Sequence, residues 1–272
     1  MTPRWIFAAC GRALCIGAVG CASALKEPPP LAVLGGTIAA PPAANEVNSV
    51  LRDAEAAFAR RPDLSSVRRA HELFLAAARA DDARVEGLLG AARACAWLIE
   101  HEGAAATRRA LATTAVQTCQ WCMRRAPDNP ECEYRLALAL GQQAREHPSS
   151  ASDGLARMVA LLTRLTERAP DLDEAGPERV LALVLLRAPG WPAGPGDPES
   201  GLEHARTAAA RRPGWAPNQL VLGEAFAKNG KPQAARTVYE RARELAAAGA
   251  AGGDPDAPGW LDEATRALAG VR

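Results

Sequence analysis

The 272-residue sequence has few aromatic side chains and no long apolar run beyond its N-terminus. Phe, Trp and Tyr together make up 4% of the residues, whereas Ala, Leu, Arg and Glu are abundant, and this balance favours helices over strands. The longest later apolar run, from Val180 to Leu186, has seven residues, whereas a membrane-spanning helix needs roughly 20. We therefore expect no later segment to cross a bilayer.

A strong net charge is also missing. The formal charge is +1, and residues 1–20 contain Arg4 and Arg12 but no acid, so the chain without them carries about −1. A near-neutral chain lacks the broad electrostatic surface with which proteins bind nucleic acid or anionic lipid. Nucleic acid is therefore excluded as the expected partner.

Residues 1–20 have the features of a signal peptide. Arg4 and Arg12 form a basic start, a short apolar run follows from Ala13, and Gly20 precedes Cys21. The stretch Ala18-Val19-Gly20-Cys21 resembles the bacterial lipobox. This resemblance implies acylation of Cys21 and, because no Asp follows that cysteine, retention at the outer membrane facing the periplasm. Plain secretion and an uncleaved anchor are the alternatives.

Residues 21–45 are rich in Pro, Ala and Gly and lack helical periodicity, which predicts a tether. From about Asn45 onward apolar residues recur every three or four positions, as in helices with one buried face. One such stripe comprises Leu155, Met158, Val159, Leu162 and Leu165. The expected organisation is therefore a signal peptide over 1–20, a tether over 21–45 and a helical domain over 46–272.

The breaks between helices repeat along the chain. Arg-Ala-Pro or Arg-Arg-Pro occurs at 125–127, 168–170 and 211–213, at intervals of 43 residues, with an irregular earlier copy at 60–62. Helix starts are expected at Asp63, Asp153 and Asp197. Regular spacing of this size indicates stacked helical hairpins, about eleven helices in all, in a solenoid that is able to curl.

The clearest repeat lies near the C-terminus. Leu222-Gly223-x-x-Phe226 is followed by Ala235-x-x-x-Tyr239-x-x-Ala242, with small residues where two helices approach and aromatic rings beside them. This pattern resembles the tetratricopeptide repeat (TPR), without its early Trp and closing Pro. The resemblance implies an all-α, TPR-like solenoid. Ala70, Phe74 and Ala77 repeat its second half, and Cys119 and Cys122 take the equivalent places in the middle of the chain.

Residues 187–242 resemble a more specific family, the T-component lipoproteins of TRAP transporters. The lipobox, the helical body and the Gly-Asp-Pro turn before the helix at 198 agree with that family. The resemblance covers about the last third of the chain. It implies a periplasmic partner, such as a solute-binding protein.

Four cysteines lie in or beside the middle repeats. Cys119-x-x-Cys122 is the spacing of a redox pair or half a zinc site, but no second such pair and no histidine pair accompanies it. Disulfides or buried free thiols are the simpler interpretations. Cys122 and Cys132 flank Pro127 symmetrically, so antiparallel helices would bring them together, and we predict a disulfide there.

No arrangement of residues predicts catalysis. The four histidines, at 71, 101, 147 and 204, are scattered over faces expected to be exposed, without metal-ligand or triad spacing. The run from Gly194 to Asp197 does not form a phosphate-binding loop, because its proline removes an amide that such a loop would need. We interpret it as a turn before a capped helix. We expect no metal, no cofactor and no enzymatic reaction.

Function is therefore expected on the concave surface of the solenoid. The expected partner or ligand residues are Leu220, Glu224, Ala227 and Lys228, with the loop residues Trp191 and Trp215 as contact platforms or core plugs. The leading hypothesis is a lipid-anchored scaffold for a periplasmic protein, which leaves its oligomeric state open. The alternative is a carrier of an apolar molecule in a channel lined by helices near 83–99, 131–144 and 174–187.

Overall fold

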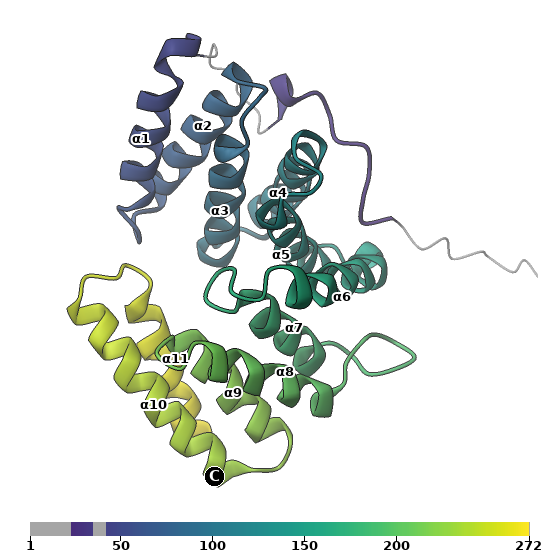
Figure 1. Cartoon of the computed structure of the whole chain (residues 1–272), viewed down its shortest axis with the longest axis vertical. Coiled ribbons are helices and arrows are strands. Elements are labelled where there is room, and N and C mark those ends of the chain that lie inside the picture. Colours follow the sequence, from purple (N-terminus) through teal and green to yellow (C-terminus); the bar gives the residue numbers. More distant parts are fainter. Residues whose placement is uncertain (1–22, 35–41, 272) are drawn as a thin grey trace, which may run out of the picture.

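The computed structural model describes residues 23–34 and 42–271, and these fold into stacked helical hairpins (Figure 1). Within these ranges there are eleven α-helices and three short 3-10 helices at 31–33, 44–46 and 148–150, and the only β-type pairing is a single bridge between Gly190 and Gly196. The α-helices are α1 (Val47–Phe58), α2 (Leu64–Ala80), α3 (Glu86–His101), α4 (Ala105–Arg125), α5 (Pro130–Glu146), α6 (Ala151–Arg168), α7 (Gly176–Arg187), α8 (Pro198–Arg211), α9 (Ala216–Lys228), α10 (Pro232–Ala251) and α11 (Ala257–Gly270). The expected all-α solenoid is confirmed.

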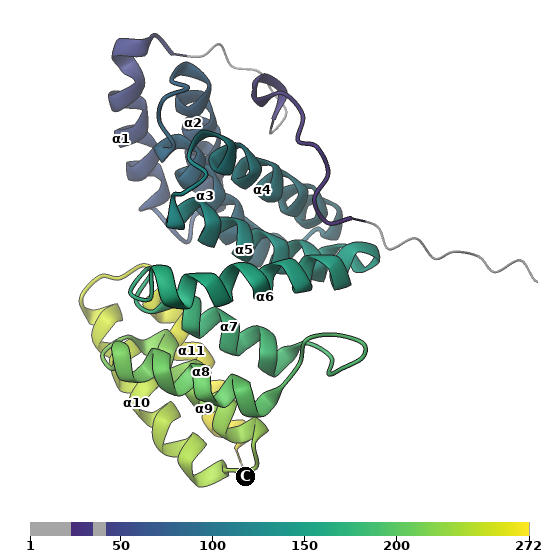
Figure 2. The same cartoon turned by 45° about the vertical axis from the view of Figure 1, so that its right-hand side comes forward.

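The helices form two layers that follow a curved path (Figures 1 and 2). Each helix packs on the next one along the chain, and the odd-numbered helices α1, α3, α5, α7, α9 and α11 also contact one another in succession. The odd-numbered helices are therefore the inner layer of the solenoid, and the even-numbered ones cover it from outside.

The repeated breaks mark helix ends. Three outer helices, α4, α6 and α8, end at Arg125, Arg168 and Arg211, which are 43 residues apart. Asp63 and Asp197 cap α2 and α8 by accepting backbone N–H bonds of the first turn. The hydroxyls of Ser66 and Ser65 donate to Asp63 and that of Ser200 donates to Asp197, and these bonds, with the backbone ones, hold the pKa of each carboxyl below its usual value. The start predicted at Asp153 is wrong, because α6 begins at Ala151 and Asp153 lies within its first turn.

Glycines beneath aromatic rings let the helices approach closely. A Cβ on Gly223 of α9 would lie 2.5 Å from the ring of Tyr239 on α10, as the TPR-like pattern predicts. A Cβ on Gly90 of α3 would lie 2.3 Å from the ring of Phe74 on α2. The same contact therefore joins helices near both ends of the solenoid.

Helix α7 is shared between two parts of the core. Val180, Leu181, Val184 and Leu185 join a buried cluster with α3, α4, α5 and α6. Ala182 and Leu186, on its other face, pack with α8 and α9. The buried apolar packing on either side of α7 is therefore connected through this helix, within the part of the chain that the structure describes.

The tether predicted over 21–45 is not free in its described part. Residues 23–34 lie along the outer layer, where Ala24, Leu31 and Leu34 are buried. The Ala24 amide donates to Asp153 Oδ2 at 2.8 Å, and the indole Nε1 of Trp121 on α4 donates to a carbonyl of the segment at 2.9 Å. Burial of leucines and satisfied backbone groups hold these twelve residues against α2, α4 and α6.

The curve of the solenoid brings its two ends together. The guanidinium of Arg61, between α1 and α2, forms two hydrogen bonds with Asp256, just before α11, at 3.0 and 3.2 Å. The same group lies 4.0 Å from the centroid of the Phe58 ring. This ion pair connects residues that are 195 positions apart in sequence.

Candidate binding groove

An apolar groove of about 670 Å³ lies on the inner layer between α3, α5, α6 and α7. Its lining comprises Ala96, Glu100, Leu138, Gly141, Gln142, Ala144, Arg145, Ala151, Leu155, Met158, Val180, Leu183, Val184, Arg187, Ala188 and Pro189. The groove is open along one side. Three of the four helices are those in which the sequence placed a channel, but the lining forms an open trough and no closed bore.

The groove exists because α5 and α7 separate along their length. Near their N-terminal ends the phenol of Tyr134 on α5 reaches α7, where a Cβ on Gly176 would lie 2.3 Å from its oxygen. Further along, the lining residues of α5 and α7 face one another across the groove. Helix α6, an outer helix, is thereby exposed between two inner ones and supplies the floor.

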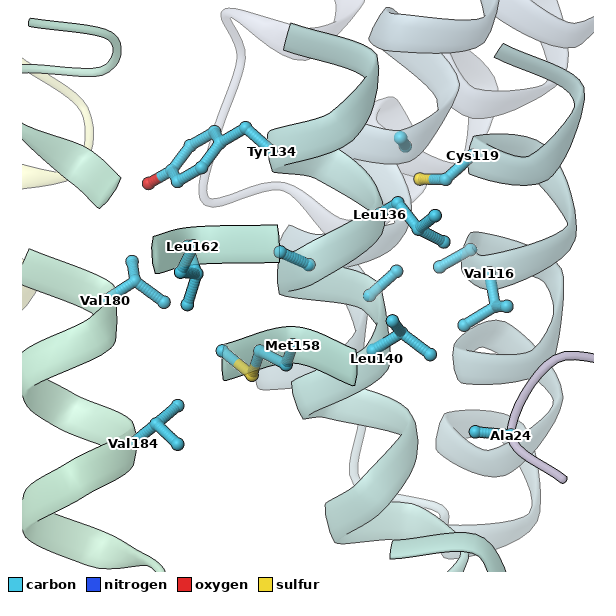
Figure 3. Close-up of a cluster of buried hydrophobic side chains, with 14 of the residues drawn as sticks. Ala24, Val116, Cys119, Tyr134, Leu136, Leu140, Met158, Leu162, Val180 and Val184 are labelled. Atoms are coloured by element: carbon cyan, nitrogen blue, oxygen red, sulfur yellow. The ribbon is translucent and has the colours of Figure 1, made fainter. Parts of the chain in front are cut away.

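The floor of the groove is made of flexible and branched apolar side chains. Figure 3 shows Val180 and Val184 of α7 facing Met158 and Leu162 of α6. The sulfur of Met158 lies where a Cβ on Gly141 would come within 2.7 Å, so this glycine leaves room for the methionine at the surface of the floor. A methionine floor adapts to occupants of different shape.

Charged groups line the rim. Arg145 of α5 and Glu100 of α3 pair at 2.9 Å, and Arg187 of α7 pairs with Glu224 of α9 at 2.6 Å. In each pair the hydrogen bond to the carboxylate raises the pKa of the arginine. Gln142 donates to the Ala96 carbonyl at 3.0 Å, while its own buried Oε1 has no partner among the described residues. The rim therefore carries charged groups on both sides of the groove.

The turn before α7 sets the position of that helix. Asp173, Glu174 and Ala175 are in the left-handed region, with φ of 51°, 55° and 64°, which is strained for residues other than glycine. The buried guanidinium of Arg179 donates to the carbonyls of Asp173 and Glu174 and to the Asp173 carboxylate, at 2.7–3.1 Å. It also donates to Asn218 of α9 at 3.0 Å. These bonds stabilise a turn that the sequence did not reveal.

The predicted contact residues of α9 are only partly on an open surface. Leu220 is a wrong prediction, because it is 5% exposed and packs against Tyr239 and Ala264 beneath α10 and α11. Glu224 is half-buried and reaches the groove through its ion pair with Arg187. Ala227 and Lys228 are exposed at the end of the helix, outside the groove lining.

The two tryptophans expected as contact platforms or core plugs differ. Trp215 is half-buried, with its ring 4.9 Å from that of Trp260 on α11, which makes it a packing residue. Trp191 is 90% exposed in the loop between α7 and α8. Of the two, only Trp191 is free to meet a partner.

The structure joins Cys122 at the end of α4 to Cys132 at the start of α5 in a disulfide, with the two Cα atoms 5.5 Å apart. This is the pair that the spacing around Pro127 predicts. Cys95 and Cys119 are free and buried. Burial raises the pKa of the Cys119 thiol to about 12, and that of Cys95 as well, so both thiols stay protonated and unreactive at neutral pH.

The histidines were expected on exposed faces, and for His71 this is wrong. His71 of α2 is 8% exposed, and burial lowers its pKa to about 4. His204 Nδ1 lies 2.6 Å from a carboxylate oxygen of Glu178, but these two side chains alone are too few ligands for a metal site. Across residues 23–34 and 42–271, no three His, Cys, Asp or Glu side chains are placed to hold a metal ion together.

The proposed acylation site, Cys21, and the signal peptide before it lie outside the described residues. Among the helices that the structure describes, none has the length and apolarity of a membrane span.

No protein-family model and no curated protein sequence matches the chain. The fold is similar to that of TTC0263, a thermophilic TPR protein in Thermus thermophilus, with a TM-score of 0.61 and 17% identity over 82% of this chain and 99% of that one. Two MamA structures, one of them MamA MSR-1 C2, match with TM-scores of 0.45 and 0.41 at 16% and 18% identity. They cover 74% and 76% of this chain and 95% of each MamA chain. The first match shows the TPR-like fold.

Proposed function

We propose that this protein is a lipid-anchored scaffold of the bacterial cell envelope that binds a protein partner through the groove between α3, α5, α6 and α7. The observation that carries the proposal is the groove itself, an apolar floor with a charged rim on the inner layer of a TPR-like solenoid. We expect binding without catalysis, because the sequence contains no metal-ligand or catalytic-triad spacing.

The shape of the groove favours a segment of protein over a small molecule. Sites for small ligands enclose most of the ligand surface, whereas this groove is open along one side. An amphipathic helix buries its apolar side chains in such a groove and leaves its polar face in water. Arg145 and Glu100 at one edge and Arg187 at the other are placed to meet its charged residues.

The location and the partner follow from the sequence resemblances. Acylation of Cys21 would hold the chain on the outer membrane, facing the periplasm. The resemblance of residues 187–242 to T-component lipoproteins supports a role as an accessory component of a TRAP-type solute transport system. The partner would then be a periplasmic protein such as the solute-binding protein of that system.

A second candidate function is carriage of an apolar small molecule. It is favoured by the low polarity of the floor, formed by Met158, Val180 and Val184, and by a volume that would hold a fatty acyl chain.

The two candidates can be separated by photo-crosslinking in cells. The photoreactive amino acid benzoylphenylalanine is placed at Ala96, which lines the groove on α3, or at Ala156, which is exposed on α6 outside it. We expect one defined protein adduct from position 96 and none from position 156. Mass spectrometry of the adduct identifies the partner and the contacting peptide.

A different result would change the assignment. Absence of any adduct at 96, together with an apolar molecule of defined mass released from the purified protein, would favour the carrier. Absence of both, or equal labelling at 96 and 156, would contradict the groove as the binding site.

A further inference from the structure

Three segments without charge lie on one side of the molecule. They are residues 23–25 of the docked N-terminal segment, residues 148–152 before and at the start of α6, and residues 188–196 in the loop between α7 and α8. In Figures 1 and 2 the end of the described N-terminal segment, the start of α6 and this loop all lie on the right-hand side. We call this surface the anchor face.

Contacts connect these segments. The Ala24 amide donates to Asp153 in the first turn of α6 at 2.8 Å, and Ser23 and Ala24 share a small polar cavity of about 140 Å³ with Ser149 and Ser150. Ala151 lines the groove together with Ala188 and Pro189 of the loop. The anchor face is therefore one continuous end of the helical stack.

These segments contain no charged side chain, although charged residues border each of them, including Lys26, which lines the same small cavity, Asp153 and Arg187. Charged side chains resist transfer out of water, so segments without them enter the interfacial layer of a bilayer at lower cost. The serines, alanines, prolines and glycines that are present can enter the headgroup region.

The loop from 188 to 196 presents one large side chain to solvent. Backbone bonds from Gly196 to the Pro189 carbonyl at 2.8 Å and from Ala193 to the Gly190 carbonyl at 3.0 Å close the loop on itself. Trp191 at its tip is 90% exposed. A closed loop loses little conformational freedom on binding, so an exposed tryptophan on it is a ready contact.

The position of the proposed acylation site, Cys21, indicates that the anchor face contacts a lipid bilayer. Cys21 is two residues before Ser23, the first described residue of the anchor face, in the sequence. Because residues 23–34 are docked on the body, the lipid on Cys21 would draw this end of the stack directly to the membrane, without the long spacer that the sequence suggested. Tryptophan is favoured at membrane interfaces, where its ring is in the apolar layer and its N–H in the wet one.

We propose that the anchor face rests on the lipid bilayer and that Trp191 inserts into the interfacial layer of that bilayer. This inference rests on the proposed acylation of Cys21. It fixes the orientation of the solenoid, with the open groove standing beside the membrane surface.

Quenching of tryptophan fluorescence by brominated lipid tests the insertion. The full-length protein, purified from cells in detergent, is reconstituted into vesicles of phosphatidylethanolamine and phosphatidylglycerol, with or without bromine atoms near the headgroup end of the acyl chains. We expect quenching in the wild type and a several-fold loss of that quenching in Trp191→Ala. Trp215→Phe is the matched control, because Trp215 follows the far end of α8, about 20 Å from the loop.

The mass of the N-terminal peptide, measured on the same sample, separates this inference from the anchor on which it rests. An acylated Cys21 with no lipid-dependent quenching, or with quenching unchanged in Trp191→Ala, overturns the insertion and leaves the anchor standing. An unmodified Cys21 overturns both. Loss of a protein crosslink in Trp191→Ala, without quenching in the wild type, would show that the loop contacts a protein instead.

Discussion

The helices before α7 and the helices after it are built from the same hairpin unit but are held together differently. In α1–α6 the buried clusters are large, Cys122–Cys132 links two helices, and residues 23–34 cover the outer layer. In α8–α11 the clusters are small and rich in alanine, and the sequence after Cys132 has no cysteine. The regular repeats are at the C-terminal end, yet the groove is in the less regular part.

This difference shows where a repeat protein obtains a binding site. Repeats that follow the consensus closely pack without gaps and supply shape. The groove is created by a departure from regular packing. Tyr134 holds one end of α5 near α7, and the other ends of these two helices diverge. Helix α7 joins the two regions, so its attachment should be the most sensitive point of the structure.

Replacing Arg179 with alanine tests that attachment and should have the largest effect. The change removes a buried cation and leaves the Asp173 and Glu174 carbonyls without their donor in a strained turn. We expect a loss of about 3–4 kcal/mol in the free energy of unfolding. We also expect separate urea transitions for the two regions, followed by circular dichroism.

The exposed pair formed by Arg187 provides the control. Arg187→Ala should cost less than about 1 kcal/mol, because its ion pair with Glu224 is solvent-accessible. A single unchanged transition in Arg179→Ala would contradict the view that this turn couples the two regions.

The glycine–aromatic contacts allow a direct comparison of the two regions. Gly90→Ala forces a methyl group into the ring of Phe74, which is fully buried, and we expect it to cost about 2–3 kcal/mol. Gly223→Ala should cost about 1–2 kcal/mol, because Tyr239 is 7% exposed and can move outward. Gly259→Ala on α11, where a Cβ meets nothing within 4 Å, should be neutral or stabilising in the same urea experiment. Equal costs at Gly90 and Gly223 would mean that both regions are packed equally tightly.

The buried His71 should make the stability of α1–α4 depend on pH. The folded-state pKa of His71 is lowered to about 4 from 6.5, so below pH 6.5 the unfolded chain binds this proton more readily than the folded one. The free energy of unfolding is therefore highest above pH 6.5 and falls as the pH drops toward 4. We expect a loss of about 2 kcal/mol between pH 7 and pH 5. His71→Leu should remove this dependence, and a pH profile identical to that of the wild type would contradict it.

The ion pair that closes the solenoid joins a largely buried arginine to a partly exposed carboxylate. Arg61→Ala removes this pairing and a hydrogen bond to the Phe58 carbonyl, and we expect it to cost about 1–2 kcal/mol. Its effect should appear in shape, because no other ion pair among the described residues joins the two ends of the solenoid. We expect a larger radius of gyration by small-angle X-ray scattering, whereas an unchanged radius would show that the curvature is set by helix packing alone.

The repeated breaks predicted the scaffold well, because helix ends and glycine–aromatic contacts are local patterns. Arg125, Arg168 and Arg211 end helices, and Gly223 meets Tyr239. The sequence could not place Leu220, which was expected on an open face, because α11 covers it and no local pattern reveals that packing.

The candidate site was predictable only in outline. Inner helices near 131–144 and 174–187 do line the groove, but its floor comes from α6, which becomes exposed only because α5 and α7 diverge. The left-handed turn at Asp173–Ala175 has no glycine to signal it. Docking of residues 23–34 likewise depends on a surface formed by three separate helices, so their composition alone suggested a tether.

The most direct test of this account is hydrogen exchange of the membrane-anchored protein with and without the partner captured at position 96. If the groove is the binding surface, amides in α5 and α7 should become protected, and those in α10 and α11 should exchange as before. Protection centred on the exposed end of α9, around Ala227 and Lys228, with α5 and α7 unchanged, would show that the regular repeats bind the partner and would contradict the account.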